Sequence, residues 1–131
     1  MTQIAIQIKD KVNGILSFDL YDILLAINEY GANYEWEVVF IEPVIIYPDR
    51  VDVENHIHYQ SDFSNSNMQW KQLVELSRIF EQICNCEVIG KSNNDTITIE
   101  GVDTSFWEIK TGSEEIIAAL KSAFNNTTSV L

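Results

Sequence analysis

The chain has 131 residues, of which 46% are hydrophobic and 21% are charged. This balance is typical of a folded globular protein and excludes an intrinsically disordered chain, and the length fits a single domain over residues 1–131. Twenty acidic and eight basic residues give a net charge of -12. Such a charge opposes binding to nucleic acid or an anionic membrane and favours a basic protein partner.

Hydropathy and cysteine content bear on the compartment. No apolar run approaches the roughly 20 residues of a membrane-spanning helix, and the segment MTQIAIQIKDK lacks the basic start and long apolar run of a secretory signal. We therefore expect a cytoplasmic protein. Cys84 and Cys86 are too close for an ordinary disulfide, so we expect them to be reduced packing residues.

Periodicity in the first third of the chain predicts a strand and then a helix. Alternate isoleucines over 3–9 indicate the strand, and Asn13-Gly14 predicts a turn. Ser17 is the expected helix N-cap and Gly31 the expected helix end. The helix is indicated by apolar residues at helical spacing, namely Leu20, Ile23, Leu24 and Ile27.

The middle of the chain predicts two strands. Residues 34–48 are rich in β-branched and aromatic side chains and should form a strand interrupted near Pro43. Residues 50–60 alternate in polarity, which predicts an amphipathic strand. Its polar face would carry Asp52, Glu54, His56 and His58.

The second half predicts two helices around three strands. Ser66 and Gln69 have the spacing of a capping box for a helix whose apolar stripe is Trp70, Leu73, Leu76, Phe80 and Ile83. Strands are expected at 86–90, 96–102 and 106–111, with a turn at 103–105. Thr111 and Glu114 have capping-box spacing for a last helix, with the stripe Ile116, Ile117, Leu120 and Phe124. The tail after this helix is expected to fray.

The predicted order of elements is βαββαβββα. Strands in hairpin-like runs favour a largely antiparallel sheet, and about three helices would pack on one face of it. The sequence therefore predicts an α+β fold, a two-layer sandwich.

The strand at 50–60 carries the sharpest candidate for chemistry. Alternate residues of a strand project from one face, so His56 and His58 could bind a divalent metal beside Asp52 and Glu54. The same alternation is typical of any solvent-facing strand. We favour the solvent-facing interpretation and expect no bound metal or cofactor.

The stretch DTSFWEIKT, residues 103–111, offers a second candidate. Ser105 could act as a nucleophile, but the sequence has no GxSxG elbow and its histidines lie elsewhere. Short polar side chains that bond the local backbone predict a turn instead. The protein is therefore not expected to be an enzyme. Trp107 is either a core residue or an interface anchor.

Residues 70–124 also carry a resemblance. The order is a Trp-led helix (WKQLVELSRIFEQI), a strand ending in VIG, then TITIEGVDTSFWEIKTG and an acidic-started helix. It resembles small bacterial proteins found near polymorphic or contact-dependent toxin genes and presumed to be immunity proteins. Those proteins more often carry Asp-Ser-Ser before the aromatic residue, so Thr104 is a departure. The resemblance implies a cognate toxin as partner and carries over no catalytic residue.

Two functional hypotheses follow. The first is a non-catalytic, acidic protein-binding protein that neutralises a bacterial toxin, possibly a nuclease with a cationic cleft. Its expected contact residues are Glu35, Glu37, Asp52, Glu54 and Trp107. The alternative is an α+β domain that binds a small ligand or a metal through His56 and His58. The pattern makes no prediction about the oligomeric state.

Overall fold

The computed structural model describes residues 3–46 and 65–130. The predicted strand at 50–60, with Asp52, Glu54, His56 and His58, lies outside the described residues. The described elements are, in chain order, β1 (Ile4–Ile8), β2 (Lys11–Val12), β3 (Ile15–Leu16), α1 (Leu20–Ala26), α2 (Asn28–Gly31), β4 (Glu35–Ile46), β5 (Ser66–Met68), α4 (Trp70–Ser77), β6 (Phe80–Lys91), β7 (Thr96–Val102), β8 (Phe106–Thr111), α5 (Glu114–Ala123) and β9 (Thr127–Ser129).

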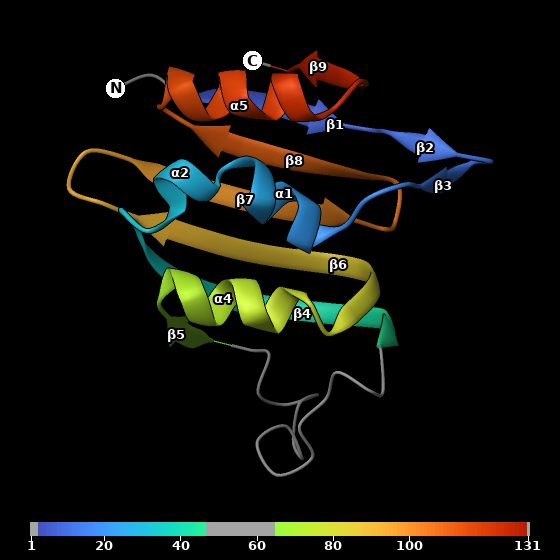
Figure 1. Cartoon of the computed structure of the whole chain (residues 1–131), viewed down its shortest axis with the longest axis horizontal. Helices are drawn as coiled ribbons and strands as arrows, with labels where there is room; N and C mark the ends of the chain where they lie inside the picture. The colour runs from blue at the N-terminus through green and yellow to red at the C-terminus, as the bar shows by residue number, and fades with distance from the viewer. Residues whose placement is uncertain (1–2, 47–64, 131) are drawn as a thin grey trace, which may run out of the picture.

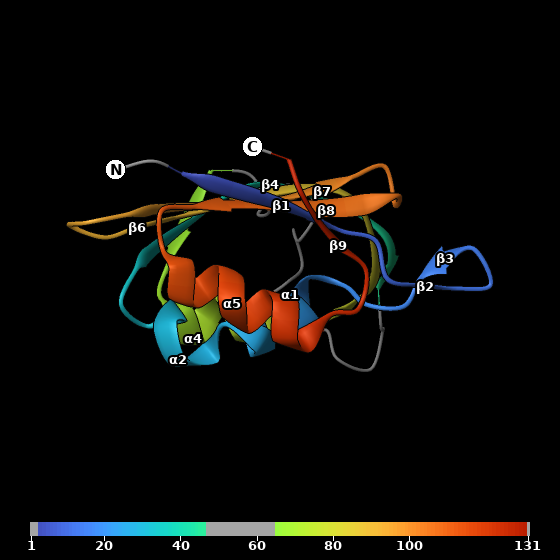
Figure 2. The same ribbon diagram turned by 90° about the horizontal axis from the view of Figure 1, so that it is seen from above.

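Seven of these strands form one sheet in the order β5-β4-β6-β7-β8-β1-β9, and each neighbouring pair is antiparallel. The described helices all lie on the same side of this sheet (Figures 1 and 2). The predicted α+β fold with two layers is therefore confirmed. Strands β2 and β3 form a separate hairpin that projects beyond the sheet. No helix in the described ranges is both long and apolar enough to cross a membrane.

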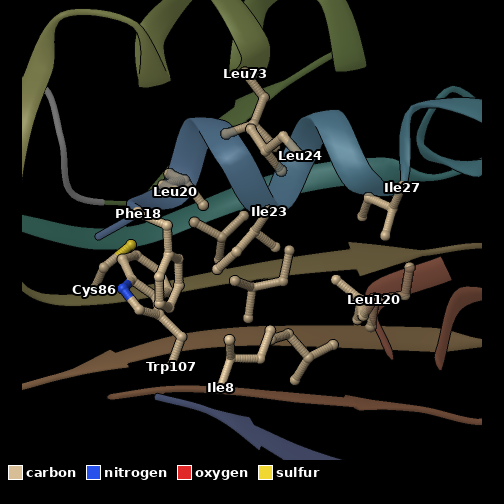
Figure 3. Packing of buried hydrophobic residues seen from close by; sticks show 14 of the residues in the cluster. Ile8, Phe18, Leu20, Ile23, Leu24, Ile27, Leu73, Cys86, Trp107 and Leu120 are labelled. Atoms are coloured by element: carbon tan, nitrogen blue, oxygen red, sulfur yellow. The ribbon is translucent and has the colours of Figure 1, made fainter. Parts of the chain in front are cut away.

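The core fills the space between the sheet and the helices (Figure 3). Strand alternation turns Ile97, Ile99 and Ile109 inward, where they are fully buried. Opposite them, α1 contributes three buried residues, Leu20, Ile23 and Leu24. The predicted stripe of the last helix is confirmed, because its four residues Ile116, Ile117, Leu120 and Phe124 are all buried.

Two tryptophans enter this core by lying over glycines of neighbouring strands. Trp36 pairs with Gly90, and Trp107 pairs with Gly101. A Cβ atom would lie 2.8 Å from the Trp36 ring at Gly90 and 3.0 Å from the Trp107 ring at Gly101, so a larger residue would displace the ring. The indole of Trp107 is 1% exposed. Its expected place on a partner-binding surface is therefore corrected, since no partner could reach the ring in this fold.

The turn between β7 and β8 is the corner predicted at 103–105. Asp103 and Thr104 have φ of 55° and 56°, and the Ser105 amide donates to the Val102 carbonyl at 2.8 Å. Left-handed backbone is uncommon for a β-branched residue, so the turn is strained at Thr104. A hydrogen bond to β6 fixes the turn: the Thr104 amide donates to the Cys84 carbonyl at 3.0 Å. The hydroxyls of Thr104 and Ser105 both donate to the Asp103 carbonyl.

The N-caps of the first two predicted helices are corrected. Asp19, not Ser17, caps α1: its backbone is extended and its carboxylate accepts from the first helical amide at 2.9 Å. The helix ends at Ala26, and the short α2 follows to Gly31. Gln69, not Ser66, caps α4, because Ser66 belongs to strand β5.

The C-terminal predictions are corrected in the same way. Ser113 caps α5, its hydroxyl accepting from the Ile116 amide at 3.3 Å, while Thr111 is still in β8. The tail does not fray as expected. Residues Thr127–Ser129 form β9 and pair with β1. The Asp10 carboxylate holds the approach to this strand by accepting from the Asn125 and Asn126 amides at 2.8 and 2.6 Å.

The predicted helix stripe at Phe80 and Ile83 is wrong, because these residues begin the twelve-residue strand β6. Along its pairing with β4 the register slips around Pro43. Glu81 and Cys84 become extra residues in β6, which leaves Phe80, Ile83 and Cys86 buried three apart. Bulges in this strand therefore give its buried residues the three-residue spacing that is typical of a helix. The interruption of the strand predicted near Pro43 is wrong, because β4 runs without a break over Glu35–Ile46; only its pairing with β6 is irregular there.

Replacement of Trp107 by alanine should lower the free energy of unfolding by about 3–5 kcal/mol, because a large cavity would open in the core. Ser105→Ala should lower it by about 1 kcal/mol at most, because the hydroxyl is exposed and makes one local hydrogen bond. Urea denaturation of both variants measures the two effects. A Trp107→Ala protein with the wild-type midpoint would contradict the core position of the ring.

Candidate partner-binding surface

The face of the sheet opposite the helices, called here the open face, is covered by none of the described helices (Figure 2). Side chains alternate between the core and this face along each strand. On β7 the open face carries Thr98 and Glu100, and on β8 it carries Glu108 and Lys110. These residues are part-exposed or exposed, while their neighbours in the strand are buried. The open face is thus a broad surface presented on rigid strands.

Three glutamates, called here the acidic row, cross the centre of the open face. Glu87 of β6 pairs with Glu100 of β7, and Glu100 pairs with Glu108 of β8. Directly opposed side chains lie about 4.5–5.5 Å apart at Cβ, and like charges in that position destabilise a sheet. Gln7 continues the row on β1, and its amide donates to Glu108 at 3.2 Å. The row therefore weakens the fold rather than supporting it.

Positive charge offsets the acidic row only in part. Lys110 Nζ lies 3.8 Å from Glu108 Oε2, and no described basic side chain forms an ion pair with Glu87 or Glu100. Lys9 lies over the Phe106 ring, 5.8 Å from its centroid.

Glu35 and Glu37, predicted to contact a partner, also lie on β4 with buried Trp36 between them. Glu37 pairs with Ile89, two residues from Glu87, so it is close to the acidic row. Glu35 pairs with Lys91 at the end of the sheet. Both glutamates line a groove of about 830 Å³ beside Trp70. Of the predicted contact residues in the described ranges, these two lie at the surface and Trp107 does not.

The acidic row was missed by sequence analysis. Each strand shows its own alternation, but the alignment of Glu87, Glu100 and Glu108 depends on the register between strands. A one-residue slip would put any of them on the core side. The signal available in the sequence was the repeated placement of a glutamate between buried residues in three consecutive strands.

The described residues offer little for metal or acid–base chemistry. No group of three or more His, Cys, Asp or Glu side chains within 3–46 and 65–130 could hold a metal ion. Cys86 is buried, and burial raises the pKa of its thiol well above the usual range. A thiol held protonated is a poor nucleophile. The hydroxyl of Ser105 is turned to a backbone carbonyl.

Two carboxylates in the described part of the chain have perturbed pKa values, and both have structural partners. Burial would raise the pKa of Asp95, but hydrogen bonds from Thr111, Gly112, Tyr34 and Thr96 outweigh it and hold the pKa below its usual value. The Gly112 amide and the Tyr34 hydroxyl each donate at 2.8 Å. Asp95 therefore fastens the β6–β7 turn to the end of β8.

The pKa of Asp19 is shifted upward, opposite to that of Asp95. Burial raises its pKa to about 7, against hydrogen bonds from the Leu20 and Ile83 amides that lower it. The Ile83 amide donates at 3.0 Å, so the carboxylate links the start of α1 to β6. Perturbed carboxylates often mark active sites, but here both oxygens are occupied by backbone amides.

No family model, curated protein or solved structure matches the chain.

Asp95→Asn should lower stability at pH 7 by about 1–3 kcal/mol, because several hydrogen bonds to a charged acceptor are weakened. The folded-state pKa of Asp95 is depressed. Its contribution is therefore complete above the unfolded-state pKa of about 3.9 and is lost as the pH falls through the folded-state value. Urea denaturation at pH 7 and pH 3 measures this. A stability difference that is equal at both pH values would contradict the assignment.

Asp19 should have the opposite pH dependence. Its folded-state pKa is about 7 against a usual 3.8, so between these values the folded protein binds the extra proton and loses stability as the pH rises. The Asp19→Asn variant cannot titrate there. The difference in unfolding free energy between wild type and Asp19→Asn, measured from pH 4 to pH 8, should therefore shift in favour of the variant. Parallel pH profiles would contradict the raised pKa.

Proposed function

We propose that this chain is a non-catalytic, acidic protein that binds a basic protein partner in the cytoplasm, and that the partner is a bacterial toxin that it neutralises. The acidic row on the open face carries this proposal. A rigid sheet face with aligned carboxylates, covered by none of the described helices, complements a cationic surface.

Stability does not account for the row. Glu100 has a glutamate opposite it on both sides, and each such pair is unfavourable by a few tenths of a kcal/mol to about 1 kcal/mol. Threonine or glutamine would suit an exposed strand equally well, as Thr98 and Gln7 do on the same face. A basic partner would turn this repulsion into attraction, which is the physical reason for assigning the row to binding.

The toxin part of the proposal has separate support. The net charge of -12 would steer a cationic partner toward the chain and speed their encounter. A nuclease has a cationic substrate cleft, so an acidic protein that covers it would inhibit it without any chemistry. The resemblance of residues 70–124 to presumed immunity proteins points to the same class of partner.

The acidic row is tested by the triple variant E87Q/E100Q/E108Q. The matched control is E29Q/E75Q/E115Q, which neutralises exposed glutamates of α2, α4 and α5 on the helix side. Each variant removes three negative charges, from -12 to -9. We expect the row variant to be as stable as wild type or more stable by up to about 1 kcal/mol, and to bind the partner more slowly than the control does.

The partner is obtained by affinity purification with the wild-type chain from its native host, identified by mass spectrometry and then produced separately. We expect a basic protein whose toxicity in growing cells is relieved by co-expression of this chain. Association rates are then compared at low and high salt. Recovery of an acidic protein or of a metabolic enzyme complex, or equal rates for the two triple variants, would refute the proposal.

A further inference from the structure

The β2–β3 hairpin presents the two most exposed large hydrophobic residues of the described chain. Val12 is 62% exposed and Ile15 is 61% exposed. They pair directly across the hairpin, so their side chains lie together on one side. Lys11 and Leu16 form the other pair, and Leu16 packs against the core. Val12 and Ile15 therefore lie on the other face of the hairpin and are not part of the core.

The hairpin is held firmly at both ends. Its tip is Asn13-Gly14, with φ of 55° and 80°, the left-handed pair that suits a tight two-residue hairpin turn. At its base the Ser17 amide donates to the Asp10 carbonyl at 3.0 Å. The Asp10 side chain is in turn bonded to the segment before β9. A hairpin fixed in this way loses little conformational entropy when it binds.

A hollow of about 300 Å³ lies beside β3 of the hairpin. It is lined by Ile15 and Leu16 of β3, Glu81 of β6 and Thr104 of the β7–β8 turn, among others. Glu81 and the neighbouring Asp103 are exposed, and no described basic side chain forms an ion pair with either. Ile15 thus borders a recess that also contains Glu81, and Asp103 lies next to its lining residue Thr104. The strained turn at Thr104 is part of the same surface.

We propose that the tip of the β2–β3 hairpin is the apolar anchor of the partner interface, and that it enters an apolar cleft with a basic rim on the protein partner. This rests on the proposed function and names the residues that would hold the complex once the acidic row has steered it. Paired apolar residues on a rigid projection, beside a recess, have the features of an interface hot spot.

Charge decides between possible occupants. Two copies of this chain would bring together two bodies of charge -12, with Glu81 and Asp103 near each recess, so self-association through the tip is opposed. Anionic lipid is opposed for the same reason. Basic groups of the described chain at this end include Lys11 on the hairpin, Lys9, which lies over the Phe106 ring, and Arg78, whose guanidinium lies over the Tyr21 ring. A cationic protein is the occupant that gains from both the apolar tip and the carboxylates.

The test uses V12T/I15T, which keeps β-branched side chains in the hairpin while making the tip polar. The control is L25Q, which removes another exposed hydrophobic, 50% exposed, on α1. The probe is the partner recovered with the wild-type chain and produced separately. We expect V12T/I15T to melt like wild type and to dissociate roughly 30-fold faster or more, with its association rate and salt dependence unchanged. L25Q should bind like wild type.

The outcomes separate the two proposals. If V12T/I15T binds like wild type while E87Q/E100Q/E108Q associates slowly, the hairpin proposal is overturned and the proposed function stands. If the wild-type chain recovers no basic protein, both fail. If sedimentation shows a wild-type dimer that V12T/I15T abolishes, or if wild type but not V12T/I15T binds phosphatidylserine vesicles, the tip serves another occupant and the proposal is also overturned.

Discussion

The start of β6 is the constraint on which the arrangement of the other elements depends. Three consecutive residues there bond to two other parts of the chain. The Ile83 amide donates to the Asp19 carboxylate before α1, while the Cys84 carbonyl and the Asn85 side chain accept from the Thr104 and Asp103 amides of the β7–β8 turn. On its other side the same stretch pairs with β4 across irregular register. The helix layer, the β7–β8 turn and the long β4 strand are therefore positioned by one short segment.

This segment also explains why the fold has a buried carboxylate and a strained turn. Strand β6 extends beyond its last pair with β7, Cys86–Gly101, so its backbone groups need other partners there. Asp19 and the β7–β8 turn are these hydrogen-bond partners. Bonding by Asp19 requires a carboxylate to be desolvated, and bonding by the turn requires left-handed backbone at Thr104. Such features often mark active sites, but here hydrogen bonding to β6 accounts for both.

The features that the sequence predicted correctly depend on local patterns, and most of those that it missed depend on contacts between distant segments. Local patterns predicted the strands at 96–102 and 106–111, the turn between them and the stripe of α5, because each depends on neighbouring residues. Apart from the helix caps and the end of the first helix, the failures depend on pairing between distant segments. Bulges in β6 gave Phe80 and Ile83 a helical spacing, β9 exists because β1 offers an edge, and the acidic row exists only in the register of three strands. Buried Trp107 could not be placed without knowing that Gly101 lies opposite.

The two surfaces proposed to bind a partner, the acidic row and the hairpin tip, would affect different steps: the row would affect association and the tip would affect dissociation. Charges on the open face act over roughly a Debye length, about 8–10 Å at moderate salt, and so affect how often partners meet. The hairpin tip acts only on contact, where removal of apolar surface from water slows separation. Both features are unfavourable in the isolated chain, one through repulsion between aligned glutamates and the other through exposed valine and isoleucine. A fold with a continuous core between its layers tolerates both, and a cationic partner with an apolar cleft would relieve both at once.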